Sequence, residues 1–254
     1  MLREILNSVL DWLRTFGAMS LFFGQLLRYT PRVFVKRFRL IVHQVHNAGA
    51  HSLVIIIVSG LFVGGVLGLQ AYTNLELFNA EDAVGIFTAL ALLKEIGPVI
   101  TALLFAGRAG TSLASEIGLM KATDQLSAME MMAVNPIRRV CVPRFLGGVI
   151  AMPFLAAVFS MVGLLGAHLV AVELLGVDVG AFWQQMQSSV EMSDVNEGII
   201  KSIAFGFVAS LVAVWEGYNA IPTAEGVGRA TTRTVVVTSI AVLILDFMIT
   251  ATLV

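Results

Sequence analysis

Cysteine is almost absent from this chain, since Cys141 is the only one. A single cysteine forms no disulfide within the chain, and the four scattered histidines make no Cys/His metal-binding pattern. The sequence also lacks GxxxxGK(S/T), the loop with which many ATPases bind phosphate. The net charge of -1 gives no indication of a nucleic-acid partner. We therefore expect no disulfide framework, no metal centre and no P-loop nucleotide site in this chain.

Charged residues are also scarce and unevenly distributed. They make up 13% of the chain, whereas 57% of the residues are hydrophobic and the mean hydropathy is +0.88. No Lys, Arg, Asp or Glu occurs between Arg39 and Glu76, or from Phe145 to Val172. A helix needs about 20 apolar residues to cross the hydrocarbon core of a bilayer. Both stretches are longer than this, so the sequence predicts an integral membrane protein.

The apolar segments predict an all-α membrane protein with five spanning helices. These helices are expected near residues 48–73, 84–108, 145–172, 197–216 and 233–254. With this assignment, every Lys and Arg except Lys94 and Lys201 falls on one side of the membrane, whereas the two opposite connections carry only acids. Basic residues mark the cytoplasmic side. We therefore expect the N-terminus on the cytoplasmic side and the C-terminus on the opposite side.

Residues 1–47 are expected to form an interfacial region that precedes a five-helix membrane domain of residues 48–254. Charges recur through this region and prevent it from crossing the membrane. Five apolar residues at helical spacing predict an amphipathic helix that lies in the interface, namely Ile5, Val9, Trp12, Leu13 and Phe16. After Pro31 the chain is expected to continue as an elbow into the first span.

The first span contains a doubled GxxxG pattern at Gly60, Gly64 and Gly68. Glycines at this spacing leave a smooth groove in which another helix backbone can approach closely. That second helix can belong to the same chain or to another subunit.

Residues 116–143 form the largest connection on the basic side, and their pattern is helical. Apolar residues recur every three or four positions, at Leu119, Ala122, Leu126, Met129 and Ala133. The polar residues fall largely off this stripe, and they are Lys121, Asp124, Gln125 and Glu130. Together with Met131 and Met132, Met129 would give an adaptable contact surface. The stripe either docks in a groove of a soluble partner or packs on the chain's own helix ends.

Four ionisable residues fall well inside predicted spans, namely Lys94, Glu95, Lys201 and Asp246. A charge at the centre of a membrane helix costs about 2.5–3.5 kcal/mol on the insertion scale. We therefore expect cross-helix pairs, Lys94 with Asp246 and Glu95 with Lys201, although the partners could be exchanged. These pairs are either structural or line a path through the membrane.

Residues 95–144, from EIGPVITALL to NPIRRVCVPR, resemble the most distinctive segment of the MlaE/YrbE family. The resemblance extends over essentially the whole chain. Members of this family are permease subunits of ABC transporters that move phospholipid between the inner and outer bacterial membranes and maintain outer-membrane lipid asymmetry. The resemblance therefore implies a lipid-transport permease of the inner membrane, with its C-terminus in the periplasm, and not an enzyme.

The resemblance also implies the partners. It indicates a homodimer that assembles with a separate ATPase, which binds ATP and Mg²⁺, with a cytoplasmic STAS-domain subunit and with a periplasmic hexamer of MCE-domain subunits. No cofactor is expected in this chain. The helix Leu119–Val134 would be the coupling helix in a cleft of the ATPase. Its candidate contact residues are Leu119, Lys121, Asp124, Leu126, Met129, Glu130 and Met132.

The resemblance implies that lipid lies in a cavity between two protomers. If the intramembrane charges line this lipid path, a cation among them could meet the phosphate. Candidates for acyl-chain contact lie near the outer end of the first span, at Leu67, Leu69, Tyr72 and Leu75, although each could instead pack in the core or face lipid. Arg108 could meet headgroups, and Glu116 could support the start of the coupling helix.

Two other interpretations of the sequence stay open. The chain could be a non-transporting scaffold that anchors soluble proteins on both sides of the membrane. It could also be a secondary transporter with Lys94, Glu95 and Asp246 as a proton relay, although no internal repeat or pair of broken helices favours this.

Overall fold

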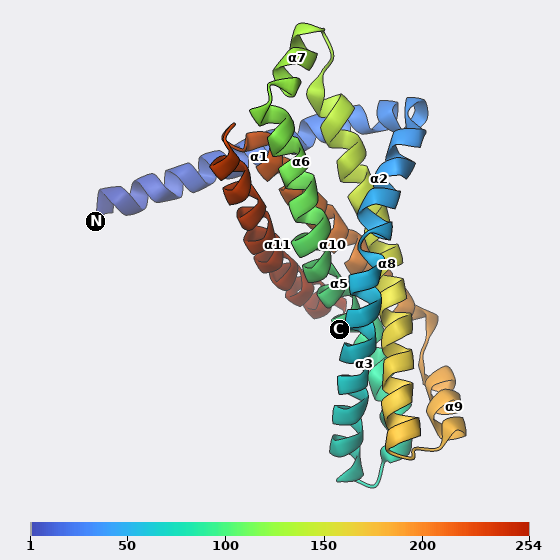
Figure 1. The fold of residues 1–254 in the computed structure, drawn as a ribbon. Helices are drawn as coiled ribbons and strands as arrows, with labels where there is room; N and C mark the ends of the chain where they lie inside the picture. The colour runs from blue at the N-terminus through green and yellow to red at the C-terminus, as the bar shows by residue number, and fades with distance from the viewer. Residues whose placement is uncertain (1, 254) are drawn as a thin grey trace.

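The protein is described by a computed structural model that covers residues 2–253, with the side chains of residues 2–13, 15, 16, 36 and 253 left outside the description. All regular elements in the described residues are helices (Figure 1), which confirms the all-α prediction. The α-helices are α1 (Leu2–Lys36), α2 (Phe38–Ala50), α3 (Leu53–Glu76), α4 (Val84–Leu90), α5 (Gly97–Phe105), α6 (Thr111–Ala122), α7 (Gln125–Met131), α8 (Val142–His168), α9 (Val179–Ser189), α10 (Met192–Asn219) and α11 (Ala224–Leu253). A 3₁₀ turn η1 (Glu81–Ala83) and four π-helical segments join them, η2 (Ala91–Ile96), η3 (Ala106–Gly110), η4 (Ile137–Cys141) and η5 (Leu169–Leu174).

Five helical stretches are long and apolar enough to cross a membrane. They are Leu53–Glu76, Glu81–Ala122, Ile137–Leu174, Met192–Asn219 and Ala224–Thr252. The number of spans agrees with the sequence prediction. The second span is much longer than predicted, because η3 carries the helix past Arg108 and on to Ala122.

Glycines bring α3 and α8 into close contact. An added Cβ atom at Gly60 would lie 3.0 Å from the Phe159 carbonyl oxygen, and one at Gly64 would overlap the Gly163 backbone. The same pattern continues at Gly68, where the added atom would lie 2.9 Å from the Ala167 carbonyl oxygen. The doubled GxxxG pattern therefore packs against a helix of the same chain, which decides between the two alternatives left by the sequence.

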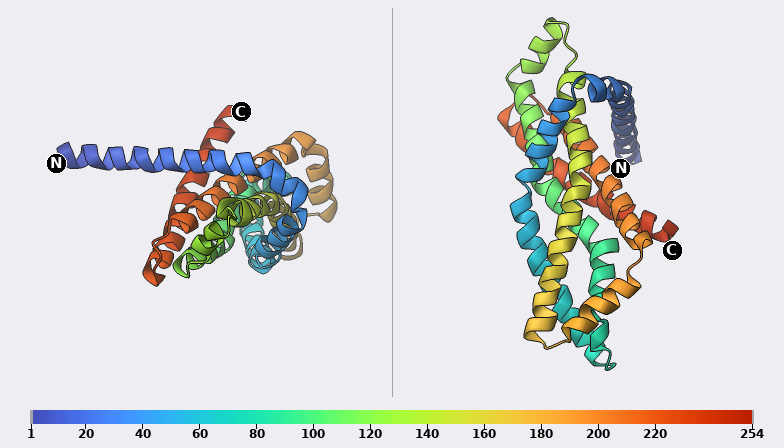
Figure 2. Two further views of the ribbon diagram at one scale, coloured as in Figure 1. Left: turned by 90° about the horizontal axis from the view of Figure 1, so that it is seen from above. Right: turned by 90° about the vertical axis from the view of Figure 1, so that its right-hand side faces the viewer.

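The N-terminal arm leaves the bundle as one long helix, α1, that extends far to the side (Figures 1 and 2). Pro31 lies inside α1, and the chain turns at Arg37 (φ -139°, ψ 33°), within the stretch after Pro31 that was expected to lead into the first span. The next helix, α2, packs along α8, so the predicted boundary at residue 47 falls inside a helix of the bundle. The predicted apolar stripe of residues 5–16 lies among the side chains outside the description.

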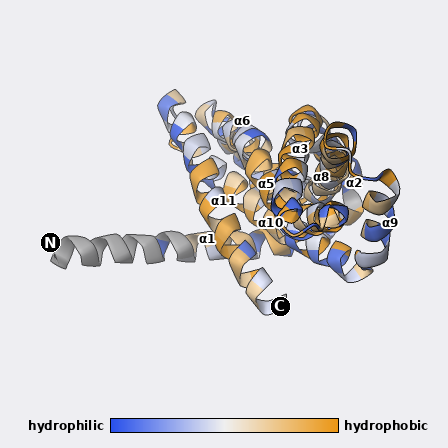
Figure 3. Ribbon diagram, turned by 90° about the horizontal axis from the view of Figure 1, so that it is seen from below, coloured by the Kyte–Doolittle hydropathy of each residue, from blue (hydrophilic) through white to orange (hydrophobic). Residues whose placement is uncertain are grey.

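The bundle has two chemically different ends. We call the end that carries α1, α7 and the connection of residues 220–223 the basic end, and the end that carries residues 77–83 and 175–191 the acidic end. In Figure 1 the basic end is at the top and the acidic end at the bottom. Between them, apolar residues colour much of α3, α5, α8 and α11 in Figure 3, as expected for surfaces in contact with lipid or with another subunit.

The predicted coupling helix 119–134 is not one continuous helix. The helix α6 ends at Ala122, Asp124 takes a left-handed conformation (φ 57°), and the short α7 follows at the tip of the basic end (Figure 1). A second left-handed residue, Ala133 (φ 58°), ends the segment. The predicted stripe is therefore split, because Leu126 is buried and Met129 is partly buried in the chain's own core, whereas Leu119 is 59% exposed.

Candidate functional site

Pro98 determines the geometry of the helix that carries Lys94 and Glu95. A proline has no backbone N–H, so the Lys94 carbonyl, four residues earlier, loses its usual helical partner. The backbone widens here into η2, where the Gly97 N–H donates to the Leu92 carbonyl. The freed Lys94 carbonyl instead accepts a hydrogen bond from Lys201 Nζ of α10 at 2.9 Å. The proline thus leaves an acceptor inside the bundle that a buried lysine satisfies.

Lys201 is the centre of the intramembrane charge cluster. Its side chain is 0% exposed, and its ammonium donates to Glu95 Oε1 at 2.7 Å, to the Lys94 carbonyl at 2.9 Å and to Thr250 Oγ1 at 2.9 Å. An ammonium has three hydrogens, so these bonds use all of its donors. Two further carboxylates lie close to Nζ, those of Glu197 at 3.3 Å and Asp246 at 3.7 Å. One side chain therefore joins η2, α10 and α11.

Lys94 points to a different set of acids. Its Nζ lies 3.2 Å from Asp194 Oδ1 and 3.0 Å from Glu197 Oε2, both in the first part of α10. Glu197 thus bridges the two lysines. The predicted pair of Glu95 with Lys201 is present, whereas the predicted pair of Lys94 with Asp246 is replaced by Lys94 with Asp194 and Glu197. The cluster contains two ammonium groups and four carboxyl groups, not the two and two expected from the sequence.

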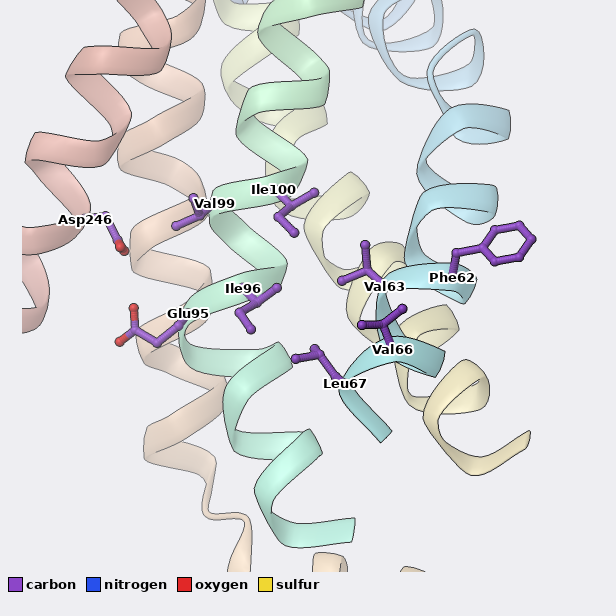
Figure 4. Close-up of a pocket in the computed structure, with 9 residues that line it drawn as sticks. All are labelled: Phe62, Val63, Val66, Leu67, Glu95, Ile96, Val99, Ile100 and Asp246. Carbon is purple, nitrogen blue, oxygen red and sulfur yellow. The ribbon is translucent and has the colours of Figure 1, made fainter. Parts of the chain in front are cut away.

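An apolar groove opens beside this cluster between α3, η2, α5 and α11 (Figure 4). Its volume is about 550 Å³, within the range of about 300–1,000 Å³ typical of small-molecule sites. The lining residues are Phe62, Val63, Val66, Leu67, Glu95, Ile96, Val99, Ile100 and Asp246. Figure 4 shows the Glu95 and Asp246 carboxylates near one another at one side and the α3 side chains at the other. The groove therefore presents hydrocarbon surface along most of its length and carboxylates at one side.

The electrostatics of the groove differ from the expectation that a cation would meet a phosphate there. Lys201 is fully buried with all its donors used, and Lys94 faces α10 rather than the groove. The ionisable groups that line the groove are the carboxyls of Glu95 and Asp246, which are 39% and 21% exposed.

The predicted acyl-chain contacts separate into three environments. Leu67 lines the groove. Leu69 lies instead in a neighbouring hollow of about 390 Å³ between α3, α8 and η5. Tyr72 and Leu75 pack on a buried cluster around Phe182. The sequence did not single out Phe62, Val63 or Val66, although they recur with Leu67 at helical spacing, because every face of this span is apolar.

At the basic end, polar contacts tie the base of the coupling segment to the bundle. Lys121 Nζ donates to the Tyr218 carbonyl of α10 at 2.8 Å, so it supports α6 rather than facing outward. Glu116 of α6 pairs with Arg144 of α8 at 3.1 Å. Arg108 Nη1 donates to the Asn47 carbonyl of α2 at 3.4 Å. Asp124 and Glu130 are exposed, and Met131 and Met132 are 83% and 68% exposed.

Comparison with known proteins identifies the family. The model of the family described as Permease MlaE matches residues 41–252. The chain belongs to the MlaE permease family. It is therefore a membrane permease subunit of a transport system, as the resemblance of residues 95–144 predicted.

Several known proteins are similar over most of the chain. The "Intermembrane phospholipid transport system permease protein MlaE" of Haemophilus influenzae is 52% identical over 96% of this chain and 94% of its own length. A "Probable ABC transporter permease protein" of Rickettsia typhi is 37% identical over 83% of this chain and 82% of its own. The chloroplast protein TRIGALACTOSYLDIACYLGLYCEROL 1 of Arabidopsis thaliana is 27% identical over 83% of this chain and 60% of its own.

Proposed function

We propose that this chain is the membrane-spanning subunit of an ABC transporter that moves phospholipid between the inner and outer bacterial membranes and so maintains lipid asymmetry. The observation that carries the proposal is the groove of about 550 Å³, which is apolar along most of its length and ends at the Lys201 cluster. Acyl chains need such an apolar surface, whereas the carboxyls of Glu95 and Asp246 offer the phosphate no cation in the groove. The printed name of the Haemophilus relative, an intermembrane phospholipid transport permease, supports the same substrate.

In the proposed orientation the basic end faces the cytoplasm of an inner membrane and the C-terminus faces the periplasm. The distribution of Lys and Arg supports this orientation, since basic residues are retained on the cytoplasmic side. If all five apolar stretches cross the membrane, the two termini lie on opposite sides, in agreement with this orientation.

The energy is proposed to come from a separate ATPase subunit, to which ATP and Mg²⁺ bind. The ABC transporter naming of the Rickettsia relative supports such a partner. The surface available for docking is smaller than the sequence suggested, and consists mainly of Leu119, Met131 and Met132 around α7. A displacement of α7 would reach α10 through the Lys121 hydrogen bond to Tyr218 and α8 through the Glu116–Arg144 pair.

A second copy of the chain, a STAS-domain subunit and an MCE-domain hexamer complete the proposed assembly. The exposed surface of α11 supports the proposal of a further protein neighbour, because only 17% of the most apolar part of this span is buried. Its exposed apolar side chains are Val236, Val237, Ile240, Leu243, Ile244, Phe247 and Met248. Since α11 also carries Asp246, a copy placed against it would close the groove and enclose lipid between protomers.

The groove can be tested by filling it. The variant Val66→Trp places a large ring in the groove at a position that is 61% exposed, so the core is not overpacked. In proteoliposomes of the chain with its co-purifying subunits, we expect ATP-dependent transfer of a fluorescent phospholipid to fall about tenfold. ATP hydrolysis should persist. The control Val54→Trp lies on the same helix, 73% exposed and away from the groove, and should transport normally.

Each other interpretation predicts a different result. A scaffold would give no ATP-dependent lipid transfer with any variant. A secondary transporter would respond to a proton gradient in the absence of ATP. Equal transfer by Val66→Trp and Val54→Trp would show that lipid does not pass through the groove.

A further inference from the structure

Three arginines meet where the N-terminal arm joins the bundle. Arg37 occupies the turn between α1 and α2, and Arg138 and Arg139 lie in η4. The segments are held together by apolar packing, because Val33 of α1 and Ile137 and Val140 of η4 belong to one buried cluster. The three cations are therefore brought together by the fold of the hydrophobic core.

No carboxylate within the described side chains compensates these charges. None of the three arginines forms an ion pair there, whereas Arg144, Arg229 and Arg233 each have an acidic partner. The Nη1 group of Arg37 is buried and has no hydrogen-bond partner. Burial and the charges of Arg139 and Arg138 lower the pKa of Arg37. A buried guanidinium nitrogen without an acceptor, beside two like charges, is costly unless an anion binds to it.

The surroundings of the cluster indicate where that anion comes from. Phe34 and Phe38 flank the turn at Arg37 with their ring centroids 5.8 Å apart, and they are 48% and 54% exposed. Val35 beside them is 82% exposed. In Figure 1 the end of α1 lies beside the start of the segment that leads into α8, below the tip that carries α7. Exposed apolar side chains next to arginines match the boundary between acyl chains and headgroups.

We propose that Arg37, Arg138 and Arg139 bind the phosphodiester of an anionic phospholipid from the leaflet at the basic end, separately from the transport groove. Guanidinium groups bind phosphate oxygens in a planar, two-point geometry. Basic pockets at the membrane surface bind anionic headgroups in this way. The bound lipid fixes the joint between α1 and α2 against η4, which is the segment that leads from the coupling tip into α8. The site does not depend on the proposed function, because it lies outside the groove and requires no transport.

The site can be tested on the purified full chain in a neutral detergent. The unfolding temperature is measured while dioleoyl-phosphatidylglycerol, dioleoyl-phosphatidylcholine or inorganic phosphate is added. We expect phosphatidylglycerol to raise the unfolding temperature at concentrations about tenfold lower than phosphatidylcholine, and higher salt to reduce the difference. Inorganic phosphate should have little effect, because it lacks the acyl chains that contact Phe34 and Phe38.

The single variant Arg37→Gln and the double variant Arg138→Gln/Arg139→Gln distinguish lipid binding from a purely structural role of these arginines. In detergent alone they should unfold at the same or a higher temperature than the natural chain, since each substitution relieves repulsion between cations. With phosphatidylglycerol, each lost arginine should weaken the apparent affinity on the order of fivefold. The control Arg229→Gln removes an equal charge at the same end from an exposed pair with Glu225, and should keep the natural affinity.

Three results would overturn the proposal. The first is equal affinity of the natural chain for phosphatidylglycerol and phosphatidylcholine. The second is an equal effect of inorganic phosphate, which would indicate a free-anion site. The third is a set of arginine variants that bind phosphatidylglycerol normally but no longer assemble with the ATPase, which would mean that the cations pair with carboxylates of a protein. Lipid transfer by the complex decides the proposed function independently of all three.

Discussion

The two lysines of the charge cluster differ in burial, and we expect them to differ in how much they stabilise the fold. Replacing each of them by methionine measures this difference. Lys201→Met removes a fully buried ammonium and keeps most of the side-chain volume. Lys94→Met removes an ammonium whose side chain is 35% exposed. We expect the first variant to be strongly destabilised and the second to be nearly as stable as the natural chain.

The size of the effect follows from the groups that are left without a partner. Without Lys201, Glu95 Oε1, the Lys94 carbonyl and Thr250 Oγ1 each lose a hydrogen bond. Removing one member of a buried ion pair costs about 3–5 kcal/mol because an uncompensated charge remains. Lys94 leaves Asp194 and Glu197, but the Glu197 carboxylate still lies 3.3 Å from Lys201. Because the Lys94 side chain is 35% exposed and Glu197 keeps Lys201 as a partner, Lys94→Met should cost clearly less than Lys201→Met.

The single cysteine of the chain can report its unfolding. Cys141 is the only cysteine and is 0% exposed in the core near the basic end, far along the bundle from Lys201. A thiol-reactive fluorophore therefore reports unfolding of the whole bundle on heating in detergent. We expect the unfolding temperature to fall by many degrees for Lys201→Met and by only a few for Lys94→Met.

A double variant tests the assignment of the partner. If Glu95 is the principal carboxylate of Lys201, then Glu95→Gln with Lys201→Met should cost clearly less than the sum of the two single changes. Equal stability of the two lysine variants would refute the reasoning, and so would simple additivity of the Glu95 and Lys201 changes. Either result would mean that the ammonium is solvated or paired differently from the structure.

Two further predictions concern packing and docking. Gly64→Ala should lower the unfolding temperature, at a cost of about 1–3 kcal/mol, because its Cβ would overlap the Gly163 backbone. The control Gly228→Ala should be neutral or slightly stabilising, because its Cβ would meet no atom within 4 Å. Equal effects of these two changes on the same assay would contradict close packing of α3 on α8. Met131→Asp should uncouple or dissociate the proposed ATPase with little effect on the unfolding temperature, because the Met131 side chain is 83% exposed. Met129→Asp should also destabilise the chain, because Met129 packs on the core. Co-purification of the ATPase and the unfolding temperature separate the two, and unchanged assembly of Met131→Asp would rule out docking at the exposed tip.

The sequence predicts the spans well because the two relevant signals are independent of side-chain packing. The length of an apolar stretch predicts a crossing, and the sign of the charges in the connecting loops shows which crossings must exist. The end of the second span was missed because Arg108 was taken as a boundary charge. In the structure its guanidinium reaches the Asn47 carbonyl, so the helix continues past it.

The coupling segment shows the limit of periodicity. Leu119, Ala122, Leu126 and Met129 keep a spacing of three or four residues on both sides of the turn at Asp124. Spacing alone contains no signal for a left-handed residue, which aspartate adopts more readily than most side chains. The two halves of the stripe consequently face different surroundings, the core for Leu126 and the outside for Leu119.

The charge cluster was found only in part because Asp194 was assigned to a connection and Glu197 fell at the boundary of the predicted fourth span. Asp194 and Glu197 stand at the start of α10, where Glu191 and Asp194 form a capping box. This motif predicts a helix start, and a helix that starts there puts Glu197 one turn before Lys201. Both signals are local and readable. In contrast, the groove depends on how α3 and α11 diverge, which no feature of a uniformly apolar helix encodes.

One helix connects the two polar sites of the molecule. Lys201 and Tyr218 both belong to α10, and a straight helix at 1.5 Å per residue separates them by about 26 Å. At the basic end the Tyr218 carbonyl accepts the hydrogen bond of Lys121, next to the coupling tip. At the other end Lys201 holds η2 and α11, which form walls of the groove. Because α10 is a continuous helix with a largely buried apolar surface, a shift at the tip moves it as a rigid body. In the proposed transport cycle, the groove would therefore change width where the Lys201 ammonium joins α10 to η2 and α11.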